Sequence, residues 1–389
     1  MVASGIFGSY SLSPLYPLYQ ERWHFSDLML SIVFVCYSLG TIVTLQFFGS
    51  ISDRFGRRAT LLPALLGVAA SMLMLSFAVN LPMLLAARVV QGVFTGIVNG
   101  TGGACLTDLA PHGDRRSAAL TYSASIAVGS ALGPLASGGL ASHAPLPLVT
   151  PYLLVLLLLA IAVVGVIVMP DTRIRARRAV GLQRLRMPQN RLGFFFACLG
   201  TVGCSASMAL YAEFGTPMAE AVHLNGASLG GLIVFIMFAA IGLAQILLRR
   251  LHPQAALVYG TLAATAGWGG IACALFTHQP ALMLTSTIVA GGGSGLAQLG
   301  GTATVIQVAS PDRRAEALSL YIVVGFCAVA GPGVGGGALS ETVHLSGTAL
   351  VMLAATGIIA VATCVTARVI KHSGQVDSDD STAAATPTS

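Results

Sequence analysis

Twelve apolar runs divide the chain, and each is about as long as a bilayer is thick. A spanning helix needs about 20 mainly apolar residues. Such runs lie near Val2–Tyr19, Leu28–Gly49, Ala59–Val79, Leu81–Leu109, Ser117–Ala141, Leu148–Met169, Leu192–Met218, Leu229–Leu248, Ala255–Phe276, Ala281–Ala309, Leu318–Leu339 and Ser346–Ile370. Short polar segments separate most of them, so consecutive helices should run antiparallel. We therefore predict an all-α integral membrane protein with twelve transmembrane helices.

The composition excludes most water-soluble classes. Charged residues make up 9% of the chain and hydrophobic residues 55%, whereas a soluble domain carries about 25% charged residues. So few charges could not cover a water-exposed surface, which excludes a soluble enzyme, a disordered chain and a nucleic-acid binder. The seven cysteines occur singly inside apolar runs, and the eight histidines lie in loops or at run ends. We therefore expect neither a disulfide framework nor a metal site.

The Lys and Arg side chains define a topology. All but two of the 20 lie in the loops on the side where the first helix starts, and the exceptions are Arg22 and Arg88. Basic loops remain on the cytoplasmic side of a membrane. The pattern therefore predicts a multi-pass protein of the plasma (inner) membrane with both termini in the cytoplasm. The natural neighbours of this basic charge are anionic lipid headgroups.

The two halves of the chain repeat one pattern. Asp114-Arg115-Arg116 precedes an apolar run that reaches Gly133-Pro134, and Asp312-Arg313-Arg314 precedes a run that reaches Gly331-Pro332 at the same spacing. The copies are about half a chain apart. This predicts two homologous six-helix bundles (1–169 and 192–371), a basic cytoplasmic linker between them (170–191) and a disordered cytoplasmic tail (372–389). Many secondary transporters have this architecture, with the substrate site between the halves.

A glycine- and arginine-rich segment lies between the second and third runs. It resembles the G-x-x-x-D-R-x-G-R-K/R signature of the major facilitator superfamily through Gly49, Asp53, Arg54, Gly56, Arg57 and Arg58. A basic loop that only sets topology would explain the charges but not the glycine spacing. The resemblance implies an inner gate in this segment, with Asp108 as the partner of its arginines.

The fourth run contains Arg88-Val-Val-Gln91-Gly92, which resembles the R-x-x-Q-G motif of the same superfamily. An arginine inside a span normally faces a cavity or a partner, although a long side chain at this depth could also reach the outer interface. Polar residues recur below Arg88 at helical spacing, which favours a cavity. The resemblance implies that the first, fourth, seventh and tenth helices line it. The predicted lining residues are Tyr10, Arg88, Gln91, Thr95, Asn99, Tyr211 and Gln298.

The fifth run resembles a glycine-proline motif that accompanies proton-driven exporters in this superfamily. Its residues are Gly129, Gly133, Pro134 and Gly138, and the second half supplies Gly331, Pro332 and Gly335. Small residues let helices approach closely and proline allows a kink. Generic tight packing would also account for the small residues, so the motif alone does not establish export.

Taken together, the motifs resemble those of twelve-helix bacterial multidrug exporters. The resemblance implies proton-coupled export of small amphiphilic or drug-like molecules by alternating access, with no cofactor, no metal and no obligatory protein partner. The alternative is an importer or facilitator of a small solute such as a sugar, an organic acid or a nucleoside-like compound. No nucleophile–base set is evident inside the runs, so we do not expect an enzyme.

Proton coupling requires a group that binds and releases a proton, and the first run contains no acidic residue, unlike the first span of several such exporters. Apart from Asp108, which is assigned to the inner gate, Glu213 is the carboxylate that lies within an apolar run. Counted along its helix, it should lie near the outer interface. It is therefore either an interfacial acid exposed to water or the proton carrier.

Overall fold

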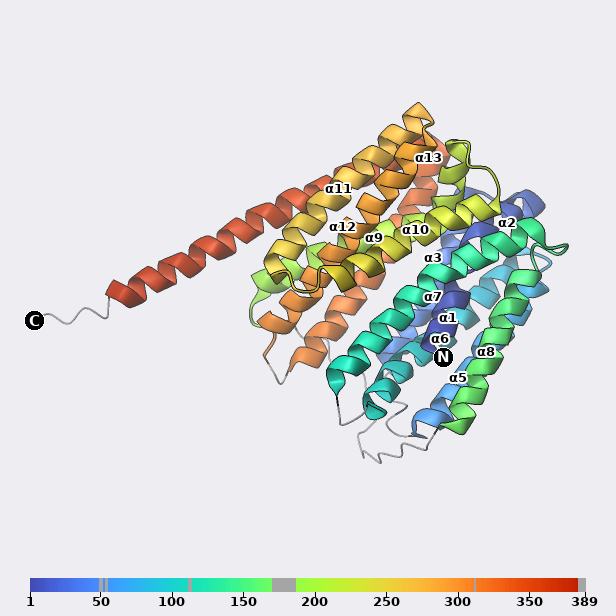
Figure 1. Cartoon of the computed structure of the whole chain (residues 1–389), viewed down its shortest axis with the longest axis horizontal. Coiled ribbons are helices and arrows are strands. Elements are labelled where there is room, and N and C mark those ends of the chain that lie inside the picture. Colours follow the sequence, from blue (N-terminus) through green and yellow to red (C-terminus); the bar gives the residue numbers. More distant parts are fainter. Residues whose placement is uncertain (49–51, 53–54, 111–113, 170–186, 311–312, 384–389) are drawn as a thin grey trace, which may run out of the picture.

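The computed structural model of the chain is a bundle of long helices that run roughly parallel or antiparallel to one another (Figure 1). It describes residues 1–48, 52, 55–110, 114–169, 187–310 and 313–383. The first half contains α1 (Val2–Tyr10), η1 (Ser13–Leu15), α2 (Tyr16–Trp23), α3 (Asp27–Phe48), α5 (Arg57–Ser76), α6 (Leu81–Asp108), α7 (Arg115–His143) and α8 (Thr150–Val168). The second half contains α9 (Arg191–Ala221), α10 (Ala227–Leu247), α11 (Pro253–Thr277), α12 (Pro280–Val308) and α13 (Arg314–Ala383).

The first span is broken rather than continuous. We predicted one helix over Val2–Tyr19, whereas the structure has α1, the 3₁₀ turn η1 and α2 in succession. Pro14 lies in η1 and Pro17 in the first turn of α2. Proline lacks the N–H that an α-helix interior needs, and its ring clashes with the preceding turn. The two prolines therefore divide this crossing into two short helices.

The last helix, α13, comprises two spans. Its backbone leaves the helical region at His344 (φ 60°, ψ 176°), which separates a segment over 314–343 from one over 345–383. The second segment continues as helix far beyond the bundle (Figure 1). We predicted disorder from residue 372. Formation of the first helical turn is unfavourable, but extension of an existing helix adds one hydrogen bond for each residue. The apolar part of α13 is already helical, so residues after 371 can extend it.

Most of the twelve predicted spans correspond to long apolar helices of the described part. Among the described helices, nine stretches are long and apolar enough to span a membrane, and one of them runs through both segments of α13. The other predicted spans correspond to the broken α1–η1–α2 segment, the glycine-rich α12 and the second segment of α13. The molecule is thus an all-helical membrane protein, and the predicted spans agree with the helices to within a few residues at most ends.

The two halves lie side by side, the first in blue to green and the second in yellow-green to red (Figure 1). Helices α3, α5, α6, α7 and α8 pack on one another and on α1, while α9 to α13 pack among themselves. Two helix pairs form most of the boundary between the halves: α7 with α10, and α3 with α13. The interior between these two pairs is therefore a place where a ligand can contact both halves.

Candidate functional site

The ends of the bundle differ in chemistry. One end, here called the basic end, carries Arg57 and Arg58 at the start of α5, Arg191 at the start of α9 and Arg249 after α10. The other, here called the distal end, includes the start of α3, the end of α7 and the kink in α13. These two names describe positions along the bundle and do not depend on which side of a membrane each end faces.

The halves are hydrogen-bonded to each other towards the distal end. Between described residues, the boundary includes six side-chain hydrogen bonds: Ser13 to Ala212, Leu28 to Glu341, Ser31 to Glu213, Ser340 to Asp27, and Ser228 to both Ser142 and Gly138. Four of them connect residues of the first half to α9 or α13, and two connect α7 to α10. The distal end is therefore closed in this conformation.

The glycine-proline motif of α7 allows close packing against two helices, α1 in the same half and α10 in the other half. A Cβ at Gly129 or Gly133 would lie 2.6 Å from a backbone oxygen of α1, that of Ala3 or Phe7. One turn further, Gly138 abuts the carbonyl of Ala227 in α10, and Gly231 of α10 abuts that of Pro134. The first two glycines hold α1 within its own half, whereas Gly138 allows the halves to close on each other.

The repeated motif in the second half packs at positions other than those we predicted. A Cβ at Gly331 or Gly335 would meet no atom within 4 Å, so neither glycine mediates close packing. The close approaches are instead at Gly333, facing Glu213, and at Gly337, facing Ser31. The rotation of α13 about its axis decides this, and the sequence spacing does not reveal it. The side chain of Pro332 lies outside the described part.

A cavity between the halves extends from the middle of the bundle towards the basic end. It consists of two adjoining hollows of about 330 Å³ and 340 Å³, which share Met208, Gln298 and Thr302. We call it the interhalf cavity. The first hollow also includes Tyr10, Phe34, Thr201, Ser205, Tyr321 and Phe326, and the second includes Ser123, Ser130, Phe238 and Gln245. Both volumes lie within the range of small-molecule sites.

The polar groups of the interhalf cavity are arranged around an amide pair. Gln245 of α10 donates from Nε2 to Oε1 of Gln298 in α12 at 2.8 Å. The backbone carbonyl of Gln298 accepts bonds from Thr302 (2.9 Å) and from Tyr321 (3.4 Å). Gln298 was among the predicted lining residues, but Gln245 was not, since one amide in an apolar run is a weak signal.

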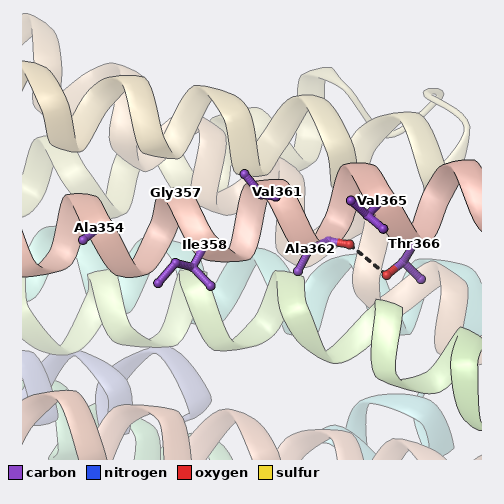
Figure 2. Close-up of a pocket in the computed structure, with 7 residues that line it drawn as sticks. All are labelled: Ala354, Gly357, Ile358, Val361, Ala362, Val365 and Thr366. Atoms are coloured by element: carbon purple, nitrogen blue, oxygen red, sulfur yellow. Dashed lines mark hydrogen bonds between the residues drawn. The ribbon is translucent and has the colours of Figure 1, made fainter.

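A larger hollow lies on the surface of α13 and is not a candidate site. Figure 2 shows its lining, which comes from one helix face between Ala354 and Thr366. Ile358 and Val361 are exposed, and the Thr366 hydroxyl donates to the carbonyl of Ala362, four residues earlier on the same helix. An open apolar groove on a membrane helix is a surface for lipid chains, and it offers no convergent polar groups.

Arg88 is fully buried beside the interhalf cavity rather than inside it. Its guanidinium donates to Oε1 of Gln91 at 2.6 Å and to the carbonyls of Val33 and Ser9 at 3.4 Å. It lies 4.6 Å from the ring centre of Tyr37 and 5.9 Å from that of Phe34, which lines the cavity. One nitrogen, Nη2, has no partner among the described residues.

The seven predicted lining residues therefore occupy different places. Tyr10 and Gln298 line the interhalf cavity. Gln91 and Thr95 are fully buried under Arg88, and Asn99 is half-buried with an unpartnered Oδ1. Tyr211 lies in the core of the second half, where its hydroxyl shares a 2.8 Å hydrogen bond with Thr287. Gln91, Thr95 and Asn99, here called the Arg88 stripe, thus pack inside the protein in this conformation and do not line the cavity.

Glu213 is 0% exposed and lies at the closed distal end. It is therefore not the water-exposed interfacial acid that we considered from the sequence. Oε2 accepts a hydrogen bond from Ser31 at 2.9 Å, while Oε1 has no partner among the described residues and faces Gly333. Helix α9 continues to Ala221, two turns beyond Glu213, so the carboxylate lies below the end of the helix. Arg88 and Glu213 are the two fully buried charged residues of the described part.

The inner-gate segment is only partly described. Gly49, Asp53 and Arg54 lie outside the described residues. Gly56 has a positive φ of 93° before α5, which is the conformation that favours glycine. Arg57 forms an ion pair with Asp108, with 2.8 Å between Nε and Oδ2, and the two side chains are 12% and 16% exposed. This pair joins α5 to α6 within the first half, and Arg58 beside it is half-buried.

Comparisons with known proteins agree with this architecture. The model of the Major Facilitator Superfamily matches residues 1–332. Two solved structures are similar over nearly the whole chain: a bacterial homologue of the human lysosomal transporter Spinster (TM-score 0.74, 13% identity, 94% of this chain and 95% of that one) and the nucleoside transporter NupG (TM-score 0.76, 14% identity, 94% and 97%). At these identities they show the fold.

Curated relatives are similar over shorter stretches. The class C tetracycline resistance protein of Escherichia coli is 34% identical over 117 residues, which is 29% of either chain. The multidrug resistance protein MdtG of Proteus mirabilis is 33% identical over 135 residues, which is 33% of either chain. The chain thus matches about a third of the length of these relatives.

Proposed function

This chain belongs to the major facilitator superfamily, and we propose that it exports small amphiphilic or drug-like molecules in exchange for protons. As a member it is a secondary transporter in a membrane and not an enzyme. Its partly similar relatives include tetracycline and multidrug resistance proteins, which supports export. We further propose that the basic end faces the cytoplasm of a plasma (inner) membrane, because basic loops remain on that side.

The observation that carries the proposal is an interhalf cavity combined with a hydrogen-bonded distal end. Residues of both halves line the cavity, which combines aromatic and aliphatic side chains and Met208 with uncharged polar groups. Such a lining suits a molecule that is apolar over most of its surface. With the basic end in the cytoplasm, this conformation would receive substrate from the cytoplasm or from the inner leaflet.

The transport step we propose is a rocking of one half against the other. The six boundary hydrogen bonds at the distal end would break, and α7 would separate from α10 while α3 separates from α13. The cavity would then open outwards and release its substrate. Rocking of two repeats around a central site is the general mechanism of such folds.

Glu213 is our candidate for the proton carrier. It belongs to the second half, and its hydrogen-bond donor Ser31 belongs to the first, so separation of the halves at the distal end would expose it. Ala209, which lines the cavity, precedes it by four residues, about 6 Å along the helix axis. An ionisable residue inside a membrane is by default a functional group. Proton binding from outside would thus be linked to opening and closing.

Efflux measurements in a bacterial host that lacks its own pumps test the proposal. Expression should lower the accumulation of several amphiphilic dyes or drugs, and a protonophore should abolish this effect. Glu213→Gln should bind substrate and exchange it but lose export driven by a pH gradient. Glu220→Gln, a change of an exposed acid on the same helix, should retain it.

Two outcomes would reject parts of the proposal. Export by Glu213→Gln at the normal rate would exclude Glu213 as the carrier. Accumulation of a test solute inside the cells, rather than depletion, would replace export by the alternative of an importer or facilitator.

A further inference from the structure

The interhalf cavity provides hydrogen bonds but no charge. The described residues that line its two hollows include serines, threonines, tyrosines and the amides of Gln245 and Gln298, but no Asp, Glu, Lys, Arg or His. An ion that enters such a site gives up hydration without gaining a counter-charge, which is costly in a weakly polar surrounding. The lining therefore disfavours substrates with a net charge.

The two buried charges of the molecule do not change this conclusion. The guanidinium of Arg88 lies over the rings of Phe34 and Tyr37 and donates to Gln91. Glu213 is bonded to Ser31 about one helical turn beyond the cavity. Neither is exposed, so neither can form a direct ion pair with a molecule in the cavity.

The amide pair offers a defined hydrogen-bonding edge. With Nε2 of Gln245 bonded to Oε1 of Gln298, the carbonyl oxygen of Gln245 and the NH₂ group of Gln298 remain for other partners. If both amides were turned over, one carbonyl oxygen and one NH₂ group would still remain. In either arrangement the pair presents an acceptor beside a donor, and both hollows meet at Gln298.

We propose that the substrate is an uncharged, flat amphiphile whose polar edge has a donor beside an acceptor, as in a carboxamide, a lactam or a nucleobase. Gln245 and Gln298 would bind this edge, while Tyr10, Phe34, Met208 and Phe238 would contact its apolar part. Each of these six side chains lines at least one of the two hollows, and Met208 and Gln298 line both. The inference rests on the proposed function insofar as the interhalf cavity is the transport site.

Three probes of similar shape test whether the cavity prefers a neutral, an anionic or a cationic ligand. They are 2-naphthamide, which is neutral, 2-naphthoate, which is an anion, and 2-naphthamidine, which is a cation. Binding to the purified protein is measured by the fluorescence of the naphthalene ring. We expect the amide to bind at least about tenfold more tightly than either ion, since each buried hydrogen bond contributes up to about 1.5 kcal/mol. Gln298→Leu and Gln245→Leu should each weaken amide binding about tenfold and leave the weak binding of the ions unchanged.

A charge introduced at the same place should invert the preference. Gln298→Glu should bind the amidine more tightly than the amide, because the cavity then holds a counter-charge. The matched control is Gln307→Glu, a change of an exposed glutamine nine residues further along α12, which should retain the normal preference. This gain of binding does not depend on how well the leucine variants fold.

Several results would overturn the inference. They are equal binding of all three probes, tighter binding of the naphthoate, no binding of any probe, or amide binding that both leucine variants retain. Failure of the proposed function looks different. In proteoliposomes with an imposed pH gradient, the naphthamide would bind in a Gln298-dependent way but would not be moved. That result would reject proton-driven export and uphold the substrate class.

Discussion

The hydroxyl of Ser31 and the carboxylate of Glu213 meet at 2.9 Å across the boundary between the two halves. Ser31 lies on α3 and Glu213 on α9, and both are fully buried. The pair is the one boundary hydrogen bond of the described part in which a fully buried charged residue takes part. Its loss should therefore change the equilibrium between conformations more than the loss of an exposed contact.

Ser31→Ala should favour opening at the distal end. The change leaves Glu213 without its hydroxyl donor, and a hydrogen bond to a charged group contributes about 1.5 to 3 kcal/mol. We expect the open population to rise about tenfold or more, measured as longer distances between spin labels on the exposed residues Glu21 and Thr342. Ser38→Ala, a buried change two turns along α3, should leave the distances unchanged, and an unchanged distribution in both variants would contradict the prediction.

Gly231→Ala should prevent complete closure of α10 on α7. The new methyl group would meet the carbonyl of Pro134, and overpacking of this kind costs about 1 to 3 kcal/mol. Transport should slow, because the conformation with a closed distal end becomes less accessible. Gly139→Ala is the control, since a Cβ there meets nothing within 4 Å. If both variants transport at the normal rate, the α7–α10 contact does not limit the cycle.

Accessibility to thiol reagents should separate the interhalf cavity from the Arg88 stripe. In a variant that lacks the seven native cysteines, a cysteine at Thr302 should react with a water-soluble reagent added at the basic end. A cysteine at Gln91 should not react in this conformation, because that side chain is 0% exposed. A transported compound should protect position 302. Equal labelling of both positions would mean that the stripe faces water as well.

Asp108→Asn should lower the stability of the first half. The ion pair with Arg57 is largely buried. Loss of an exposed pair costs about 0 to 1 kcal/mol of stability, and loss of a fully buried pair about 3 to 5 kcal/mol. We therefore expect the free energy of unfolding to fall by about 1 to 3 kcal/mol. Thermal unfolding in detergent measures the change. Exchange of the two charges in Arg57→Asp with Asp108→Arg should recover part of the loss. No recovery would show that geometry, and not charge alone, maintains this contact.

The helices were predictable from the sequence because each apolar run is a local signal. One exception also has a local cause, because Pro14 and Pro17 break the first span. The repeat of Gly133-Pro134 at Gly331-Pro332 indicated two related halves. The spans depend on neighbouring residues, so spacing and composition predicted them, whereas the break at Pro14 and Pro17 was missed.

The site was less predictable because it depends on which residues of distant helices face each other. Glu213 was expected near the interface from its distance along α9, but the packing of α3 and α13 buries it. Gln245 carried no signal until α10 was placed beside α12. Tyr211 illustrates the opposite error: its helix lines the cavity, but its own side chain turns into the core. The rotation of each helix about its own axis decides whether a side chain faces the cavity, as Gln245 does, or the core, as Tyr211 does.

The six hydrogen bonds at the distal end also set an energetic scale for transport. The three neutral bonds of Ser13 and Ser228 contribute about 1 kcal/mol each and the Ser31–Glu213 bond about 1.5 to 3 kcal/mol, so breaking these four at once would cost roughly 4.5 to 6 kcal/mol. One elementary charge that crosses a membrane at 100 mV releases about 2.3 kcal/mol. The voltage-driven movement of one coupling ion could therefore offset about two of the neutral bonds but not the whole set. The remaining free energy must come from contacts that form at the basic end as the distal end opens, so turnover should depend on membrane voltage more weakly than on the fit between the two closing surfaces.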